Sequence, residues 1–330
     1  MNLFLVTSPF QLLCAIEAKQ EYKTKDNILL LREEKAGNAV AQMRLLLNKD
    51  EWDHIVFLGR KSKVWEARKL QSKLKRISPS LSFNYVFYAD YSAWRTNVLL
   101  NNISVNHEVM FDDGVGTLRE FNDKIQPRAV VSRNKASRDF LLKLVGLKPA
   151  RKIYPRDNFS FFTFFELPNS DFPVRVNKLS QIRNRLNTSN CFSQTAPIGF
   201  IGQGMVATKG IKLNYYVNML KELISENDKP IIYFPHRTEE SFVREKLEAI
   251  EGLTYHQSKL PLELEISKES LELSKIYGIA STASVSLGVL YPEVEIVDLS
   301  VPIEHYEMEA FGKNFHFIAK QLRLQSIELE

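Results

Sequence analysis

The chain has 330 residues, of which 44% are hydrophobic and 25% are charged. Both fractions are ordinary for a globular protein and exclude a disordered or collagen-like chain, and the length predicts two domains of ordinary size. The formal net charge of +5 is too small to indicate a nucleic-acid-binding protein, so no nucleic-acid partner is expected.

Two cysteines, Cys14 and Cys191, lie far apart in the sequence and form no metal-ligand pattern with histidine. Their number and spacing disfavour a structural zinc site and favour a reducing compartment. No apolar run reaches the ~20 residues that span a bilayer, and the N-terminus lacks the features of a signal peptide. We therefore expect a cytoplasmic protein, with at most a peripheral association at the inner face of the membrane.

In the first half of the chain, short apolar segments rich in β-branched and aromatic residues alternate with charged, helix-prone segments. The predicted strands are 2–7, 27–32, 54–59, 83–89 and 108–111. Residues 9–22 and 63–77 are two of the helix-prone segments between them. Near-continuous apolar strands that alternate with helices indicate parallel βαβ units joined by right-handed crossovers.

The alternation lapses between about residues 120 and 195, where 137–147 is predicted to be a helix and 159–168 is rich in aromatic residues. The polar segment 184–197 is the best linker candidate. After it, strands are predicted at 198–202, 230–235, 274–280 and 294–299, with helices at 214–227, 243–252 and 284–291. The sequence thus predicts an α/β chain with two Rossmann-like domains, residues 1–190 and 191–330, facing across a cleft that holds the active site.

Four polar clusters follow predicted strands, where an open parallel sheet binds its ligands. They are Thr7–Gln11 after the first strand, Asp112–Gly114 after the fifth, His236–Arg237, and Ser281–Ser284. The chain contains neither GxGxxG nor GxxxxGK[ST]. Their absence argues against a nicotinamide dehydrogenase and against a P-loop nucleotide hydrolase.

The first two clusters each have a structural and a functional explanation. Ser8 precedes a proline at the first helical position, which is typical of a helix cap, and Gln11 could simply lie at the surface. Asp112 and Asp113 can form a solvated turn with Gly114, or a general base if one carboxylate is partly desolvated beside the other. Magnesium is a further possibility for the pair, although no third ligand is evident.

The two later clusters also each have a structural and a functional explanation. His236 and Arg237 suit a phosphate, whereas a surface histidine is the ordinary alternative. Ser281, Thr282 and Ser284 can open a helix whose free N–H groups bind an anion, and at least one of these residues is expected to be a helix cap.

The order of these motifs resembles that of bacterial sialyltransferases of the GT-B fold, in particular glycosyltransferase family 52 and the capsule polysialyltransferases. It runs from TSPFQ through FDDG, Gly202-Gln203 and PHR to PLE and the serine-threonine cluster, and it covers nearly the whole chain. The resemblance implies an inverting transfer of sialic acid from CMP-sialic acid to a glycan acceptor, lipooligosaccharide or capsule. It implies neither a metal nor a cofactor.

The resemblance also implies residue roles. Asp112 and Asp113 fall on the acidic motif that supplies the general base, and Asp112 is favoured as its first acid. His236 falls on the histidine that contacts the CMP phosphate, and Ser281 and Thr282 fall on hydroxyls that bind it. Further substrate contacts are expected from Thr7, Ser8, Gln11, Gly114, Gly202, Gln203, Arg237, Glu263 and Ser284.

One glutamate of the pattern has two possible registers here, and one position departs from the pattern. Glu263 resembles the glutamate that holds the cytidine ribose, but Glu265 is an alternative register. The histidine is followed by Arg237 and preceded by Pro235, so either the chain carries a variant of the motif or His236 sits differently from the family histidine.

Other functions stay open at this point. One is a GT-B transferase that uses CMP-Kdo or a UDP- or GDP-sugar, and another is a non-catalytic protein that binds nucleotide sugars or glycans. A receiver-type phosphoacceptor is disfavoured by the length and by the second α/β half. The basic segment Lys61–Arg76 could lie on an anionic membrane, but a solvated helix face is favoured. A monomer and a homodimer are both compatible with the sequence.

Overall fold

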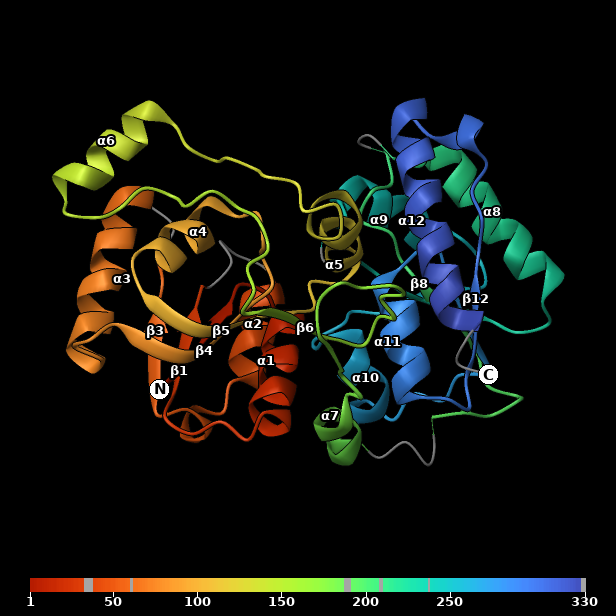
Figure 1. Cartoon of the computed structure of the whole chain (residues 1–330). Helices are drawn as coiled ribbons and strands as arrows, with labels where there is room; N and C mark the ends of the chain where they lie inside the picture. The colour runs from red at the N-terminus through yellow and green to blue at the C-terminus, as the bar shows by residue number, and fades with distance from the viewer. Residues whose placement is uncertain (33–37, 60–61, 187–190, 208–209, 237, 328–330) are drawn as a thin grey trace. The chain divides into compact units, whose positions relative to one another are not determined.

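The computed structural model describes residues 1–32, 38–59, 62–186, 191–207, 210–236 and 238–327. The chain divides into two compact units, unit 1 (Met1–Gln181) and unit 2 (Ile182–Glu330), whereas the sequence placed the boundary after residue 190. In Figure 1 the colour of unit 1 runs from red through yellow to green, and that of unit 2 runs from green to blue. Each unit has its own sheet, which confirms the predicted α/β chain with two Rossmann-like halves.

Within the described residues, unit 1 forms a seven-stranded sheet in the order β3-β2-β1-β4-β5-β6-β7, with parallel pairing throughout. Its strands are β1 (Asn2–Val6), β2 (Asn27–Leu31), β3 (His54–Phe57), β4 (Ser82–Tyr88), β5 (Ser104–Phe111), β6 (Phe159–Thr163) and β7 (Val174–Val176). Its helices are α1 (Pro9–Glu21), α2 (Asn38–Leu46), α3 (Lys63–Ile77), α4 (Trp94–Asn101), α5 (Val115–Glu120), α6 (Ala136–Leu144) and the start of α7 (Ser180–Arg185), with a 3-10 turn at Lys49–Glu51 and a π-helical turn at Phe121–Ile125.

The core of unit 1 surrounds its central strands. All residues of β1 and β2 are buried, as expected for strands that are covered on both faces. Phe4 of β1 stacks on Phe87 of β4 with ring centroids 4.4 Å apart, and Phe111 and Phe162 belong to the same buried cluster. This packing holds the carboxyl ends of β1, β4 and β5 next to one another.

Strands β6 and β7 lie in the region where the sequence alternation lapses. Phe159–Phe162 of β6 pair with Glu108–Phe111 of β5, and β7 pairs with β6 in turn. The chain between β5 and β6 contains only the short helices α5 and α6 and the π-helical turn. The sequence therefore shows no long helical pattern that would predict a crossover connection to a further parallel strand. The aromatic-rich stretch is therefore a buried strand of the sheet.

Unit 2 forms a five-stranded sheet in the order β10-β9-β8-β11-β12 within the described residues, and its pairings are also parallel. Its strands are β8 (Ile198–Ile201), β9 (Ile231–Phe234), β10 (Leu253–Tyr255), β11 (Lys275–Gly278) and β12 (Glu295–Asp298). Its helices are α8 (Leu213–Glu226), α9 (Ser241–Glu248), α10 (Leu262–Lys268), α11 (Thr282–Leu290) and α12 (Glu309–Ile327), with a 3-10 turn at Ile303–His305.

The strand order of both units reverses at one point. In unit 1 the chain crosses from one side of β1 to the other before β4, and in unit 2 it crosses β8 before β11. A crevice at the carboxyl ends of the strands is expected at such a switch point. Among the described residues, no helix combines the length and apolar character needed to cross a bilayer.

Candidate active site

Three polar side chains gather at the switch point of unit 1. Thr7 follows β1, Asp90 follows β4 and Asp113 lies just after β5. The Thr7 hydroxyl lies 3.4 Å from Oδ2 of Asp90, and Asp90 and Asp113 both line a pocket of about 400 Å³. Sequence reasoning singled out Thr7 and Asp113 but missed Asp90, which directly follows the predicted strand 83–89.

Gln11 connects Thr7 to Asp113. It is 2% exposed, so the surface explanation for this residue does not hold. Its Oε1 accepts hydrogen bonds from the Thr7 backbone N–H at 2.8 Å and from the Thr7 hydroxyl at 3.0 Å. Its Nε2 donates to Oδ1 of Asp113 at 2.7 Å. Because both ends of the amide are engaged, Gln11 fixes the position of the Asp113 carboxylate.

Ser8 serves as the helix cap that its position before Pro9 predicts. It is the N-cap of α1, and its Oγ accepts a hydrogen bond from the Gln11 backbone N–H at 3.2 Å. Such a cap typically contributes about 1 kcal/mol to helix stability. Here it also anchors the first turn of the helix that carries Gln11.

Asp112 is fully buried, with 0% exposure. The Thr163 hydroxyl donates to its Oδ1 at 2.5 Å, and the Phe164 backbone N–H donates to its Oδ2 at 3.0 Å. Burial raises the pKa of Asp112 to about 7, and the hydrogen bonds from Thr163 and Phe164 oppose that rise. The charge of Asp113 is only a smaller contribution to the raised pKa. Asp112 therefore ties the end of β5 to the end of β6.

Asp113 is exposed, because neighbouring residues at the end of a strand point to opposite sides. Its backbone N–H donates to the Thr117 hydroxyl at 2.9 Å. Gly114 follows with φ 63° and ψ −141°, a conformation that side-chain-bearing residues rarely adopt. The glycine lets the chain turn from β5 into α5 while Asp113 stays at the pocket.

The raised pKa of Asp112 predicts a pH dependence of stability. Because its pKa is about 7 in the folded protein against 3.8 ordinarily, the folded protein holds this proton more tightly than the unfolded chain. The resulting stabilisation is complete below the unfolded-state pKa and is lost as the pH rises through about 7. Relative to Asp112→Asn, the wild-type free energy of unfolding should fall from pH 4 to 7 by at most roughly 4 kcal/mol. Urea unfolding of the wild type and of Asp112→Asn from pH 4 to 7 measures this change. If the difference between their free energies of unfolding does not vary with pH, burial does not raise the pKa of Asp112.

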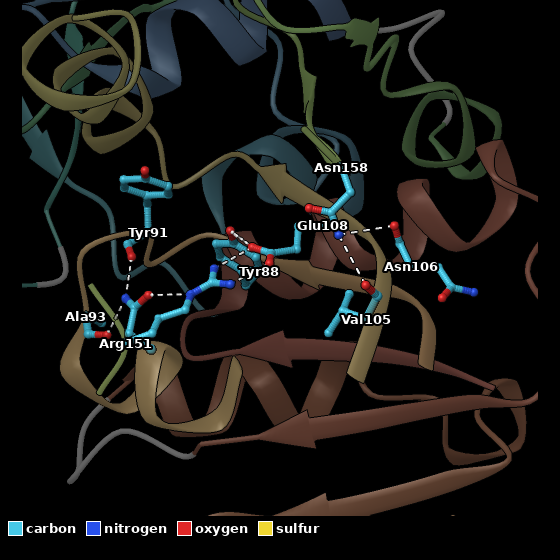
Figure 2. Close-up of polar contacts among 9 residues, drawn as sticks. Tyr88, Tyr91, Ala93, Val105, Asn106, Glu108, Arg151 and Asn158 are labelled. Carbon is cyan, nitrogen blue, oxygen red and sulfur yellow. Dashed lines mark hydrogen bonds and ion pairs between the residues drawn. The ribbon is translucent and has the colours of Figure 1, made fainter. Parts of the chain in front are cut away.

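A buried ion pair supports the loop after β4. Glu108 and Arg151 are 3% and 9% exposed, and both guanidinium Nη atoms donate to the carboxylate, at 2.6 and 2.5 Å (Figure 2). The Tyr88 hydroxyl donates to the same carboxylate at 2.9 Å. Arg151 Nε donates to Oδ1 of Asn97 at 3.2 Å, and Asn97 Nδ2 donates to the Tyr91 carbonyl at 2.7 Å. Tyr91 lines the pocket, so the ion pair is linked to the pocket wall.

In unit 2, Gly202 and Gln203 directly follow β8. A Cβ atom at Gly202 would lie 2.5 Å from the Tyr233 hydroxyl and 2.8 Å from the Phe234 carbonyl oxygen, so only glycine fits beside β9. Gln203 is 8% exposed, and its Nε2 donates to the Ile279 carbonyl oxygen. These contacts join the loops that follow β8 and β11.

His236 follows β9 and is exposed. Its Nδ1 accepts a hydrogen bond from the Thr238 backbone N–H at 3.2 Å, which assigns the proton of the neutral ring to Nε2. A Cβ atom at Gly204 would lie 2.1 Å from Nδ1, so glycine allows the loop after β8 to approach the imidazole. Arg237, the other half of the predicted cation pair, lies outside the described residues.

Ser281 is the N-cap of α11, and its Oγ accepts from the Ala283 backbone N–H at 3.2 Å, which confirms that one residue of this cluster is a cap. Thr282 is the first residue of the helix. The Ser284 hydroxyl is buried and has no hydrogen-bond partner among the described residues. Asp298, which the sequence analysis did not consider, ends β12 and accepts from the Ala280 backbone N–H at 2.6 Å.

The two candidate glutamates differ in their surroundings. Glu265 is 0% exposed and accepts hydrogen bonds from the backbone N–H groups of Lys259 at 3.0 Å and Leu260 at 2.8 Å, so it anchors its own loop. Glu263 is 6% exposed, accepts from the Ser286 hydroxyl of α11 at 2.8 Å, and has a pKa raised by burial. Of the two glutamates, Glu263 is therefore the one whose carboxylate is hydrogen-bonded to α11, through Ser286.

Where the described residues are concerned, no three side chains of His, Cys, Asp or Glu gather as a metal site would require. The predicted residues instead form two groups. Thr7, Gln11, Asp113 and the newly found Asp90 meet in unit 1, and Gln203, His236, Ser281 and Thr282 follow strands of unit 2 at the carboxyl edge of its sheet. An aspartate immediately after a predicted strand is the signal that could have found Asp90, and an aspartate near the end of the predicted strand 294–299 is the signal that could have found Asp298.

No protein-family model matches the chain, and no curated protein matches it. Among the solved structures that resemble it over most of their length are two epimerases. The UDP-GlcNAc 2-epimerase of Neisseria meningitidis bound to UDP-GlcNAc is 10% identical, with 92% of this chain and 83% of that chain covered and a TM-score of 0.52. The UDP-GlcNAc 2-epimerase of Methanocaldococcus jannaschii is 13% identical, with 98% and 92% covered and a TM-score of 0.51.

A weaker likeness, with a TM-score of 0.40 at 12% identity, links 99% of this chain to 98% of the ADP-heptose lipopolysaccharide heptosyltransferase II of Escherichia coli. At these identities the comparisons show the fold alone. The chain has a GT-B-like fold with two parallel α/β sheets.

Proposed function

We propose that the chain is a glycosyltransferase that moves sialic acid from CMP-sialic acid to a glycan acceptor, with Asp113 as the general base. The observation that carries the proposal is the Asp113 carboxylate, which is exposed at the pocket of unit 1 and is held there by Gln11. A general base must reach the proton that it removes. Asp113 meets this condition, whereas Asp112, which the sequence favoured, is sealed beneath the strand ends.

The reaction needs a base for the acceptor and stabilisation for the leaving group. The acceptor oxygen attacks the anomeric carbon of sialic acid as Asp113 takes the hydroxyl proton. The bond from that carbon to the phosphate oxygen breaks, and CMP leaves with the bonding electron pair. Attack opposite the leaving group inverts the anomeric configuration.

Residues of unit 2 are proposed to bind the departing phosphate. The Nε2–H of His236 is a hydrogen-bond donor, and Ser281 and Thr282 lie where α11 begins, with the N–H groups and the positive end of its dipole. Donors placed where negative charge develops lower the barrier to bond cleavage. Because a phosphate monoester is already a good leaving group, the proposal requires no metal ion.

The proposal predicts the effect of removing His236. His236→Ala should weaken CMP binding and lower turnover by about 10²–10³, because a donor to developing charge is lost. Ser281→Ala and Thr282→Ala should each cost less, since neutral hydroxyls are weaker donors. His54→Ala removes an exposed histidine of unit 1 and serves as the control. Calorimetric titration with CMP and initial-rate measurements provide the readouts. Unchanged CMP affinity in His236→Ala would remove this residue from the phosphate site.

The function itself is tested by incubating the protein with CMP-sialic acid and a panel of bacterial oligosaccharides. Sialylated product and released CMP, both persisting in EDTA, are the expected result. Activity that disappears with EDTA and returns with magnesium or manganese would overturn the metal-free mechanism. Competition by CMP, UMP, UDP and GDP identifies the nucleotide. Conversion of UDP-GlcNAc to its 2-epimer, with no transfer from CMP-sialic acid, would overturn the transferase assignment in favour of an epimerase.

A further inference from the structure

The pocket in unit 1 has an acidic wall formed by the ends of two neighbouring strands. Asp90 follows β4 and Asp113 follows β5, and these strands pair through Tyr88 and Met110 just before the two acids. The proposed function places the reacting hydroxyl of the acceptor at this wall, because Asp113 must reach its proton. Any second recognition group on the acceptor therefore meets the remaining walls.

The remaining walls carry four cationic side chains. They come from α5, from the chain that leads into α6 and from the first turn of α6 itself, and they are Arg119, Arg133, Lys135 and Arg138. Arg119, Arg133 and Lys135 are exposed, whereas Arg138 is half-buried with its guanidinium 5.6 Å from the centre of the Trp94 ring. Cations of this kind are suited to binding carboxylate or phosphate groups.

The third acid of the pocket does not neutralise these cations. Glu120 lines the pocket, but the Lys124 ammonium lies 2.9 Å from each of its carboxylate oxygens and the Ser92 hydroxyl donates to it at 2.6 Å. Its charge is therefore already compensated by a lysine that does not line the pocket. The pocket therefore has an acidic side, formed by Asp90 and Asp113, and a basic side, formed by the four cationic residues.

Further positive charge lies next to the basic side. The pKa of Lys63, at the start of α3, is lowered first by the charge of Arg138, then by burial, and further by Arg95 and Lys135. Like charges lower the pKa of an ammonium group only when they are close to it. The basic side therefore belongs to a wider cluster of cations, which an anionic ligand would stabilise.

Two buried donors in the pocket residues also lack a protein acceptor. The Tyr91 hydroxyl and the Trp94 indole N–H form no hydrogen bond within the described part of the chain, although the two residues are only 2% and 8% exposed. Buried donors are normally satisfied. Tyr91 and Trp94 also supply aromatic surface, and a volume of about 400 Å³ falls in the range of small-ligand pockets.

We infer that this pocket binds an anionic glycan, one that carries a carboxylate or phosphate group near the hydroxyl that accepts the transferred sugar. The inference rests on the proposed transferase function and specifies its acceptor class. The hydroxyl lies at Asp113, and the anionic group lies toward Arg133 and Arg138. A neutral glycan would occupy the same pocket without satisfying the basic side.

The test measures acceptor binding without any donor, so that its result does not depend on transfer. Two matched pairs serve as probes: lactose with 3′-sialyllactose for a carboxylate, and galactose with galactose 6-phosphate for a phosphate. The wild-type protein should bind the anionic member of at least one pair roughly 10-fold more tightly, because hydrogen bonds to charged groups are strong. This preference should shrink as sodium chloride is raised, because salt screens charge.

Substitutions identify the side chains that give the preference. Arg133→Gln and the double variant Arg133→Gln/Arg138→Gln should reduce it stepwise. The control Arg68→Gln removes an exposed arginine of α3 that does not line the pocket, and it should keep the full preference. Circular dichroism checks that each variant is folded. If the double variant is unfolded, Arg133→Gln alone still tests the inference.

Three results of the binding measurements overturn the inference. They are equal affinity within both pairs, no binding of either anionic probe, and a preference that survives in Arg133→Gln and in the double variant. Transfer from CMP-sialic acid to neutral and anionic acceptors with equal kcat/KM would also overturn it while leaving the transferase function intact. Conversely, a charge-dependent preference in binding without transfer would support the anionic site and contradict the proposed reaction.

Discussion

Asp113→Ala is expected to lower the rate of sialyl transfer by about 10²–10⁴, the usual contribution of a general base. The Asp113 carboxylate is the acid of the pair that is exposed at the pocket, and Gln11 donates to it at 2.7 Å. Because the proposed base would touch the acceptor and not the nucleotide, CMP affinity should stay close to that of the wild type. Initial rates and calorimetric titration with CMP measure the two effects.

Variants of neighbouring residues separate this role from a structural one. Asp113→Asn keeps the shape and the contact with Gln11 but removes the base, so it should be as inactive as Asp113→Ala. Gln11→Ala should lower kcat less, because the base is still present but is less well held. Full turnover in Asp113→Asn would disprove the assignment. If Asp112→Asn alone lost activity while remaining folded, the base would instead be Asp112.

Arg151→Met is expected to destabilise unit 1 by about 3–5 kcal/mol, which is the usual cost of leaving one partner of a buried ion pair uncompensated. Glu108 is only 3% exposed and would lose the two guanidinium donors seen in Figure 2. The loss would also release Asn97, which holds the loop that contains Tyr91. Urea unfolding of the variant and the wild type measures the difference.

Two controls accompany this substitution. The double variant Glu108→Gln/Arg151→Met should be less destabilised than Arg151→Met, because it removes the buried charge along with its partner. Arg128→Met removes an arginine of the same unit that lies 3.8 Å from Asp171 at the surface, and should cost only about 1 kcal/mol or less. Equal losses for the exposed and buried arginines would show that the Glu108–Arg151 pair does not hold the fold together.

The central strands could be predicted from the sequence because a strand that is buried on both faces appears as a continuous apolar run. Residues 2–7 and 27–32 contain β1 and β2, and the helix signal at Pro9 marks the start of α1. The polar residues after these strands could be found because ligand sites of parallel sheets lie at their carboxyl ends. This reasoning selected Thr7, Gln11 and Asp113, which the structure brings together.

Other features depend on tertiary packing and leave little trace in the sequence. Alternation predicts that Asp112 and Asp113 point to opposite sides, but the burial of Asp112 follows from β6 pairing with β5. That pairing could not be read from the aromatic stretch 159–168, which lies beyond a long irregular connection. The link between Gln11 and Asp113 likewise joins residues 102 positions apart in the chain.

The pairing of β5 with β6 also determines the order in which unit 1 can assemble. Asp112 and Thr163 are 51 residues apart, and Glu108 and Arg151 are 43 apart, so both contacts require a long loop to close. During synthesis the nascent chain presents the open edge of β5 before its partner strand has emerged from the ribosome. Parallel edges that wait for distant partners fold slowly and are prone to aggregation. Efficient production of this protein should therefore depend on chaperones that shield this edge until β6 arrives.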